Sequence, residues 1–296
     1  MTDAAAGPLN IAVLGAAARH ERVGLLVVAS PAILLIGAIC LLPVAWLFWI
    51  SFTGENGFTL EHYRRIVENP VYLQIFWNTF LVSAIITFLA ILLGFPLCYA
   101  ITLLPDRLSV ICIGLVLLPF WTSLLVRTYA WLVLLQRNGI INDLLQFVGI
   151  IDTPLRLAYT WPGTVVGMLH IVLPFFILPM YAAMRSMDHD LMRAASSLGA
   201  SPTRAFWTVF VPMTLPGITA GALLVFVYCL GFYVTPEILG GGRIVMIAMK
   251  VQQNATIYAD WGAASSVGLI LLAVTLAVFL VIARIVRRQR ATVHNV

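Results

Sequence analysis

Six long apolar segments dominate the chain and constrain its fold more than any other feature of the sequence. They cover residues 23–52, 75–104, 110–135, 161–184, 213–236 and 263–286. A helix of about 20 apolar residues is long enough to cross the roughly 30 Å hydrocarbon core of a bilayer. Because 61% of the residues are hydrophobic and only 10% are charged, too few polar side chains remain to cover a water-exposed surface. We therefore expect an all-α, polytopic membrane protein with six transmembrane helices.

The first apolar segment is expected to remain as a helix. It starts at residue 23, is longer than the apolar region of a signal peptide, and is not followed by a typical cleavage site. We expect a tail at 1–22, a first transmembrane helix at 23–52, a domain with the other five helices at 73–286, and a basic tail at 287–296.

The distribution of charge predicts the direction of the chain in the membrane. If the N-terminus is cytoplasmic, the cytoplasmic segments hold ten basic and five acidic residues, and the outer segments hold seven of each. The net charge of +5 then lies entirely inside, as the positive-inside rule requires. We therefore expect both termini to be cytoplasmic. We expect no nucleic-acid partner, because the basic residues form no soluble patch.

Two outer segments contain short amphipathic helical patterns. In the first, Leu60, Tyr63 and Ile66 recur at helical spacing, Thr59 can cap the helix, and Pro70 ends it. The second covers residues 140–147, with Asn138 as a candidate cap. Prolines also interrupt the apolar segments, either where freed carbonyls face a translocation path or where packing sets a kink. These prolines are Pro96, Pro119, Pro174 and Pro179.

The polar segment 185–212 predicts two short helices that meet at a sharp corner. Asp188 can cap the first helix, and Gly199 permits the left-handed conformation that ends it. Ser201 and Pro202 are the residues that start a second helix. Asp190 adds negative charge to the first turn, where the helix dipole favours it.

The same segment resembles the EAA loop, the coupling segment of the inner-membrane subunits of ABC importers. The loop is written EAA, three residues, G, nine residues, I-x-L-P, and the matching positions are Ala194, Ala195, Gly199, Val209, Val211 and Pro212. Arg193 replaces the acidic residue of the motif, and it would need an acidic partner or would point to solvent. The candidate coupling residues are Asp190, Arg193, Ala194, Ala195, Leu198, Gly199, Ala200, Ser201, Pro202 and Pro212.

Two further stretches resemble the spermidine and putrescine permeases. They are PFWTSLLVRTYAWLVLLQRNGIIN at 119–142 and GFYVTPEILGGGRIVMIAMKVQQNATIYADWGAAS at 231–265. The resemblance implies a type I ABC importer permease fold in the bacterial inner membrane, surrounded by lipid. It also implies a second permease subunit, a dimer of ATP-binding subunits and a periplasmic solute-binding protein. A polyamine is the expected solute, with an opine, an aminophosphonate or an iron complex as alternatives.

Charged and aromatic residues near the outer ends of the segments are candidates for the solute path. A carboxylate could meet an ammonium group, and aromatic faces could add cation–π contacts. The alternative is that these side chains are interfacial anchors, with Arg127 and Glu237 as a structural pair. His170, in the middle of a segment, is either a proton relay or a packing histidine. The path candidates are Trp121, Tyr129, Trp131, Tyr228, Tyr233, Glu237 and Asp260.

Missing motifs restrict the class of protein. The sequence contains no P-loop, so ATP hydrolysis is expected on a separate chain. The four cysteines lie inside apolar segments without metal-ligand spacing, and we expect neither a metal nor a cofactor. A self-sufficient secondary transporter would need mid-membrane carboxylates and an internal repeat, and a membrane enzyme would need a cluster of catalytic groups. We find none of these in the sequence.

Overall fold

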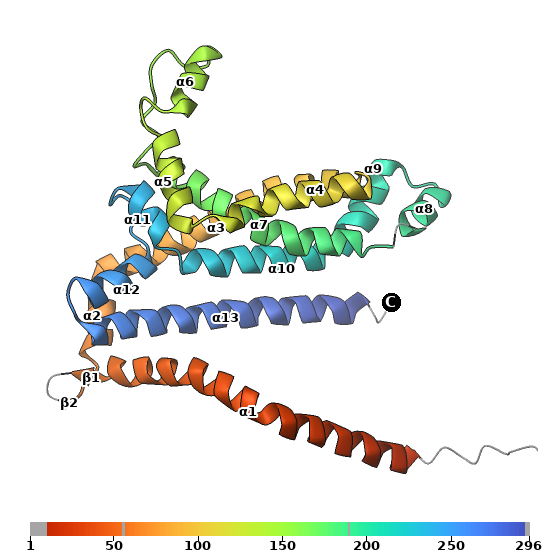
Figure 1. Cartoon of the computed structure of the whole chain (residues 1–296), viewed down its shortest axis with the longest axis horizontal. Coiled ribbons are helices and arrows are strands. Elements are labelled where there is room, and N and C mark those ends of the chain that lie inside the picture. Colours follow the sequence, from red (N-terminus) through yellow and green to blue (C-terminus); the bar gives the residue numbers. More distant parts are fainter. Residues whose placement is uncertain (1–10, 55–56, 189, 294–296) are drawn as a thin grey trace, which may run out of the picture.

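A computed structural model describes residues 11–54, 57–188 and 190–293, and most of these residues are helical (Figure 1). A 3₁₀ turn, η1, covers Leu118–Trp121, and a π-helical turn, η2, covers Phe206–Phe210. A two-residue hairpin pairs β1 (Thr53–Gly54) antiparallel with β2 (Gly57–Phe58). The α-helices are α1 Ile11–Ser51, α2 Glu61–Glu68, α3 Pro70–Thr102, α4 Asp106–Leu117, α5 Leu124–Leu134, α6 Ile140–Phe147, α7 Trp161–Arg185, α8 Asp190–Ser197, α9 Pro202–Ala205, α10 Val211–Leu230, α11 Val234–Gly240, α12 Ile247–Thr256 and α13 Trp261–Val293.

The expected all-α membrane fold is confirmed. Within the described residues, five helical stretches are long and apolar enough to cross a membrane, or six if one bent pair is counted as a span. The five are Val27–Ser51, Pro70–Thr102, Trp161–Arg185, Pro202–Leu230 and Trp261–Val281.

The third expected segment, 110–135, is not one straight helix. The stretch Asp106–Trp121 and helix α5 form the bent pair, and they meet at an angle of 98°. Pro119 lies in the 3₁₀ turn η1, and Thr122 and Ser123 then adopt extended backbone conformations. Proline lacks the amide hydrogen that would continue the helix, so the break follows it directly.

The fifth expected segment, 213–236, is also shifted. The helical stretch begins at Pro202 and ends at Leu230, and Gly231 follows it. Pro236 lies in the separate helix α11.

The ends differ from expectation as well. Helix α1 starts at Ile11 and helix α13 continues to Val293, so parts of the expected tails are helical. The remainder of those tails, 1–10 and 294–296, lies outside the described residues.

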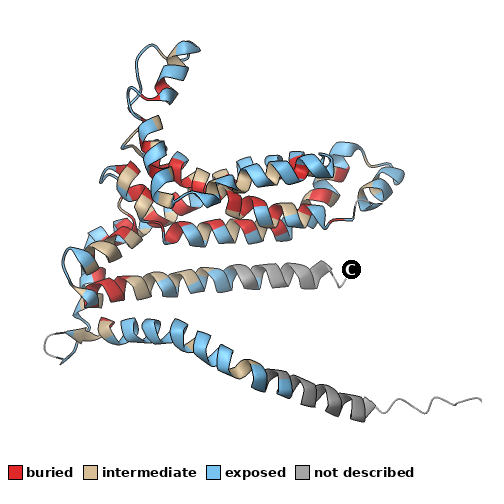
Figure 2. Cartoon of the chain, viewed as in Figure 1, coloured by how far each residue is buried: buried red, intermediate tan, exposed pale blue. Residues whose placement is uncertain are grey.

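Helices α3, α7 and α10 form the packed core of the molecule (Figure 2). The ring of Phe176 on α7 is fully buried between Gly94 on α3 and Gly221 on α10. A Cβ atom on either glycine would collide with that ring, so the small residues allow the three helices to approach closely. The close contact fixes the core as one unit.

Helix α1 is the opposite case, because it lies outside the core, contacts α13 near the hairpin and diverges from it toward the other end (Figure 1). The most apolar 18 residues of Val27–Ser51 include no buried residue. The C-terminal end of the helix is anchored by Ser51, whose hydroxyl lies 2.8 Å from the Tyr63 hydroxyl of α2. The exposed apolar length is suited to lipid or to another membrane helix.

The α2 helix is confirmed, since it covers Glu61–Glu68. Its cap differs from expectation, because Leu60, not Thr59, is the N-cap residue and no side chain caps the helix; Thr59 accepts a hydrogen bond from the Glu61 amide. Helix α6 is also confirmed, but its cap differs from expectation. Gly139, not Asn138, is the N-cap residue, and it has no capping side chain.

Candidate functional site

The polar segment between α7 and α10 forms an exposed corner at one end of the bundle. Helices α8 and α9 project together at the right of Figure 1, near the same end as the described termini of α1 and α13. Helix α8 has no buried residue. We call residues 188–205 the α8–α9 corner.

The first half of the corner has the predicted local structure. The Asp190 amide donates to the Asp188 carboxylate at 2.9 Å. At the other end of α8, Gly199 has a φ of +83°. The Gly199 amide donates to the Ser196 carbonyl at 3.0 Å, and the Ala200 amide donates to the Ala195 carbonyl at 3.1 Å. This pair of hydrogen bonds is a Schellman motif, and it fixes the end of the helix.

The second half of the corner also follows the prediction. Ser201 is the N-cap of α9, its hydroxyl accepts a hydrogen bond from the Arg204 amide at 3.4 Å, and Pro202 is the first helical residue. The turn between the two short helices is therefore defined on both sides by capping interactions.

The corner is attached to the core through aromatic side chains that the sequence analysis did not single out. Phe206 and Phe210 of η2 stack on each other at 5.3 Å between ring centroids. Tyr99 of α3 contacts both rings edge-on, at 5.3 and 5.2 Å. The signal in the sequence was the i, i+4 spacing of the two phenylalanines, which a general apolar pattern concealed.

Pro212 has a structural reason for its position after this cluster. A proline inside an α-helix loses one hydrogen bond and collides with the carbonyl four residues earlier. Here the Val211 amide donates to the Phe206 carbonyl, five residues back, so the helix widens into a π turn directly before Pro212. The motif residue therefore coincides with a helix irregularity that often marks functional segments.

The surface of α8 is mostly small or solvent-exposed. Ala194 is exposed, Ala195 is half-buried, and the Leu198 side chain is 88% exposed. Arg193 has found an acidic partner, since its guanidinium donates to the Asp190 carboxylate at 3.3 Å on the same helix. The small side chains of Ala194 and Ala195, beside an arginine that is already paired, are suited to close approach by a partner.

Two of the path candidates lie near the break in the third span. Trp121 ends η1 and is 91% exposed. Phe120 packs on Phe175 at 5.0 Å, and Phe175 stacks on Tyr228 of α10 at 4.7 Å. The structure thus connects Tyr228 to the break through two phenylalanines that the sequence analysis missed.

Trp131 on α5 faces α7. Its indole N–H donates to His170 Nδ1 at 3.1 Å, an interaction that favours the packing interpretation of this histidine. Arg127, one turn earlier on the same helix, is half-buried, and its Nε has no hydrogen-bond partner among the described residues. Arg127 and Glu237, which the sequence suggested as a structural pair, do not form an ion pair among the described residues.

Tyr129, Tyr233 and Glu237 are all exposed. Tyr233 is the N-cap residue of α11, and Glu237 lies in the first turn of that helix. Thr128 and Thr235 join α5 to α11 through a buried contact of 3.2 Å between their hydroxyls.

Asp260 lies apart from the other path candidates, at the junction of α2 with α13. Its carboxylate accepts a hydrogen bond from the Ala263 amide at 2.8 Å. Arg65 of α2 approaches it at 3.4 Å, and His62 lies 4.0 Å away. These contacts give Asp260 a structural role as a helix cap and an inter-helix link.

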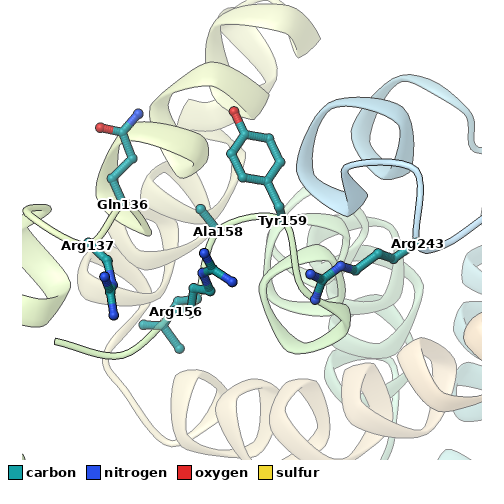
Figure 3. Close-up of a pocket in the computed structure, with 7 residues that line it drawn as sticks. Gln136, Arg137, Arg156, Ala158, Tyr159 and Arg243 are labelled. Atoms are coloured by element: carbon teal, nitrogen blue, oxygen red, sulfur yellow. The ribbon is translucent and has the colours of Figure 1, made fainter. Parts of the chain in front are cut away.

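A cavity with three arginines lies near α11, at the opposite end of the bundle from the α8–α9 corner. Figure 3 shows the side chains of Arg137, Arg156 and Arg243 around the same space. The remaining lining residues are Gln136, Leu157, Ala158 and Tyr159. We call this the arginine cavity. No sequence pattern predicts this cavity, because its three charges are far apart along the chain.

No group of three metal-ligating side chains occurs within the part of the chain that the structure describes. The geometry therefore offers two features for function, a corner at one end and a charged cavity at the other.

The comparison with protein families decides the class of this chain. Residues 23–291 match the family model described as "Binding-protein-dependent transport system inner membrane component". The chain belongs to this family of ABC importer permeases. It is an inner-membrane transport subunit and not an enzyme.

The most similar curated relatives in the comparison are polyamine permeases. The chain is 34% identical over 241 residues to the spermidine/putrescine transport system permease protein PotB of Haemophilus influenzae, covering 78% of this chain and 84% of the relative. It is 33% identical over 214 residues to the PotB protein of Escherichia coli K12, covering 72% and 78% respectively.

A solved structure confirms the fold. A chain of the bacterial alginate ABC transporter, crystallised with a periplasmic protein that holds an alginate pentasaccharide, aligns with a TM-score of 0.71. The alignment covers 91% of this permease and 96% of that chain at 18% sequence identity. The fold of this permease is therefore that of an ABC importer transmembrane subunit.

Proposed function

We propose that this permease forms one half of a transmembrane pair with a second homologous permease, and that it imports a polyamine. Two ATP-binding subunits bind, one at the α8–α9 corner of each permease. A periplasmic solute-binding protein delivers the solute at the opposite end. The α8–α9 corner carries the proposal, because it is exposed to a partner and joined to the core.

The corner gives ATP binding a mechanical connection to the membrane helices. An ATP-binding subunit that grips α8 moves the rings of Phe206 and Phe210, and these rings pack on Tyr99 of α3. When the ATP-binding subunits close, the corners of the two permeases approach each other. The cavity between the permeases then opens outward, and hydrolysis resets it.

The orientation follows from the charge distribution and from the position of the corner. The described ends of α1 and α13 and the α8–α9 corner share one end of the molecule (Figure 1). The positive-inside rule assigns that end to the cytoplasm. The solute-binding protein then approaches the end that holds α6, α11 and the arginine cavity.

The identity with PotB proteins supports a polyamine as the solute. Tyr228, Tyr233 and Glu237 provide aromatic faces and one carboxylate for an ammonium group. Each cation–π contact contributes about 0.5–2 kcal/mol. Opines, aminophosphonates and iron complexes are alternative solutes, and competition for uptake separates them.

Two glycines of equal geometry provide a matched test of coupling. Gly199 ends α8 and Gly149 ends α6, with φ values of +83° and +75°, and an added Cβ would meet nothing within 4 Å at either site. The Gly149 and Ile150 amides repeat the Schellman pattern, donating to Gln146 and Leu145. Proline cannot adopt a positive φ, so Gly199→Pro and Gly149→Pro break equivalent turns at opposite ends.

The measurement is ATP hydrolysis by the reconstituted four-subunit complex with saturating loaded binding protein. Gly199→Pro should reduce the stimulated rate at least tenfold, and Gly149→Pro should retain most of it. Equal rates in the two variants, at equal amounts of assembled complex, would reject coupling at α8. Solute uptake driven by an ion gradient without ATP would instead favour a secondary transporter.

A further inference from the structure

The arginine cavity concentrates positive charge from three separate loops. Arg137 lies between α5 and α6, Arg156 lies in the loop before α7, and Arg243 lies between α11 and α12. The cavity has a volume of about 420 Å³, and no carboxylate lines it. None of the three arginines makes an ion pair with another described residue.

Hydrogen bonds hold the cavity loops in place. The fully buried side chain of Asn142 donates to the Leu155 carbonyl at 3.0 Å and accepts from the Leu155 amide at 2.9 Å. It also donates to the Gln136 carbonyl at 3.0 Å. Asn142 therefore ties the backbone beside Arg156 to the backbone beside Arg137.

The other wall is shaped by two residues with positive φ. Tyr159 has a φ of +59° and Gly241 has a φ of +54°. A Cβ on Gly241 would lie 2.9 Å from Tyr159 atoms, so the glycine leaves space for the tyrosine. A non-glycine residue in this conformation costs about 1–3 kcal/mol, and the surrounding contacts must maintain it. The Arg243 amide donates to the Gly240 carbonyl at 3.0 Å, which fixes the third loop.

Preorganised like charges favour an anionic ligand. Three guanidinium groups around one cavity repel each other unless an anion neutralises them. The planar guanidinium fork matches a carboxylate or a phosphate, with two parallel hydrogen bonds. Because the loop backbones are already held, binding needs to order mainly the exposed arginine side chains.

We propose that the arginine cavity receives an acidic side chain of the periplasmic solute-binding protein. This inference rests on the proposed orientation, which puts the cavity on the periplasmic side. The lining residues all lie in turns outside the ends of the helices (Figure 3), where a water-soluble protein can reach them. Leu157, Ala158 and the Tyr159 ring supply apolar walls for the alkyl part of an acidic side chain. The family is binding-protein-dependent, so a partner is expected to dock on this side.

The experiment measures the concentration of loaded binding protein that half-saturates ATP hydrolysis by the reconstituted complex. Arg156→Gln and Arg243→Gln should each raise this concentration about tenfold, which corresponds to ~1.4 kcal/mol. The maximal rate should not change, because the α8–α9 corner is intact. Arg156→Lys should give an intermediate value, since it keeps the charge but loses the fork.

Arg64→Gln is the matched control. Arg64 is exposed on α2 and pairs with Glu68, so this variant removes one positive charge from the same side without touching the cavity. Its half-saturating concentration should stay within about twofold of the value for the unmodified complex, because an exposed ion pair contributes little free energy. A rise equal to that of Arg156→Gln would mean that only general electrostatic attraction is present, and would overturn the proposal.

Two further results would overturn the proposal. One is an unchanged half-saturating concentration in Arg156→Gln and Arg243→Gln at equal maximal rates. The other is an effect that occurs only when anionic phospholipid is present and disappears in nanodiscs of phosphatidylcholine, because the cavity would then bind a lipid headgroup. Failure of the proposed function is distinct, since the unmodified complex would then show no stimulation by the binding protein at any concentration.

Discussion

The arginines of α7 and α8 differ from those of the arginine cavity in whether they have an acidic partner. At the end that holds the α8–α9 corner, Arg185 donates to the Asp106 carboxylate at 2.8 Å, and Arg193 pairs with Asp190 at 3.3 Å. At the other end, the arginine cavity has no acidic partner within the described chain. Arg185 and Arg193 are thus neutralised within the chain, whereas the three cavity arginines have no such partner among the described residues.

This difference indicates two kinds of recognition. On α8, Ala194, Ala195 and Leu198 are accessible and the Arg193–Asp190 pair is satisfied within the chain, so we expect the proposed partner to recognise shape and the contact to depend weakly on salt. The arginine cavity presents three exposed positive charges, so we expect the proposed partner to recognise charge and the contact to weaken as salt increases. Four predictions test this contrast, from the largest expected effect to the smallest.

The largest effect concerns which end is cytoplasmic. In a chain whose four native cysteines are replaced by alanine, Ser196→Cys on α8 should not react with an impermeant maleimide in intact cells, whereas Asp152→Cys near α6 should react fully. Both residues are exposed in the single chain, so permeabilised cells that lack the ATP-binding subunits should label both. Labelling of Ser196→Cys in intact cells would reverse the proposed orientation.

The next effect concerns shape recognition at the corner. Ala195→Glu should reduce stimulated ATP hydrolysis to the basal rate, because it adds a charge where a groove must close around α8. Gln252→Glu on α12 adds the same charge at a half-buried site remote from α8 and should retain stimulation. Stimulation of Ala195→Glu at the normal rate would show that α8 does not insert into a partner.

A smaller effect is expected at the solute path. Glu237→Gln should weaken uptake of a cationic solute about tenfold, a change of ~1.4 kcal/mol. It should affect a neutral solute little, because only the charge is lost. Initial uptake rates are measured against solute concentration with saturating binding protein. Identical curves for the Glu237→Gln variant and the unmodified permease would mean that the permease leaves charge selection to its binding protein.

The smallest effect is expected at Arg193. Both partners of its pair with Asp190 are exposed, with side-chain exposures of 83% and 77%, and such pairs contribute little to stability. Arg193→Gln should therefore change stimulated ATP hydrolysis less than twofold. A loss comparable to that of Ala195→Glu would show that the arginine contacts the ATP-binding subunit, and that charge matters at this end too.

Local chemistry explains which parts were predictable from the sequence. Membrane spans are long and apolar, and the capping residues Asp188, Gly199 and Ser201 act on backbone groups only a few positions away, so their effects can be read along the chain. The break after Pro119 could not be read in this way, because residues 110–135 are apolar on both sides of it. Proline in a membrane helix is compatible with a kink or with a complete break.

The arginine cavity was unpredictable for a different reason. Its charges come from three loops that only the packing of α5, α7 and α11 brings together. Arg137, Arg156 and Arg243 each have an ordinary sequence context, and no local spacing relates them. A binding site formed by tertiary contact leaves no periodic signal in one sequence.

The continuous helical stretch from Pro202 to Leu230 has a mechanical consequence. Its 29 residues give a rod of roughly 44 Å at 1.5 Å per residue, with the α8–α9 corner at one end and Gly231 at the other. The π turn widens this rod without interrupting it, and Tyr99 supports it from the side. Under the proposed coupling, a displacement of α8 therefore acts on one helical stretch that ends at the glycine where the chain turns into α11, with Pro216 as the one proline inside α10 where that stretch can bend.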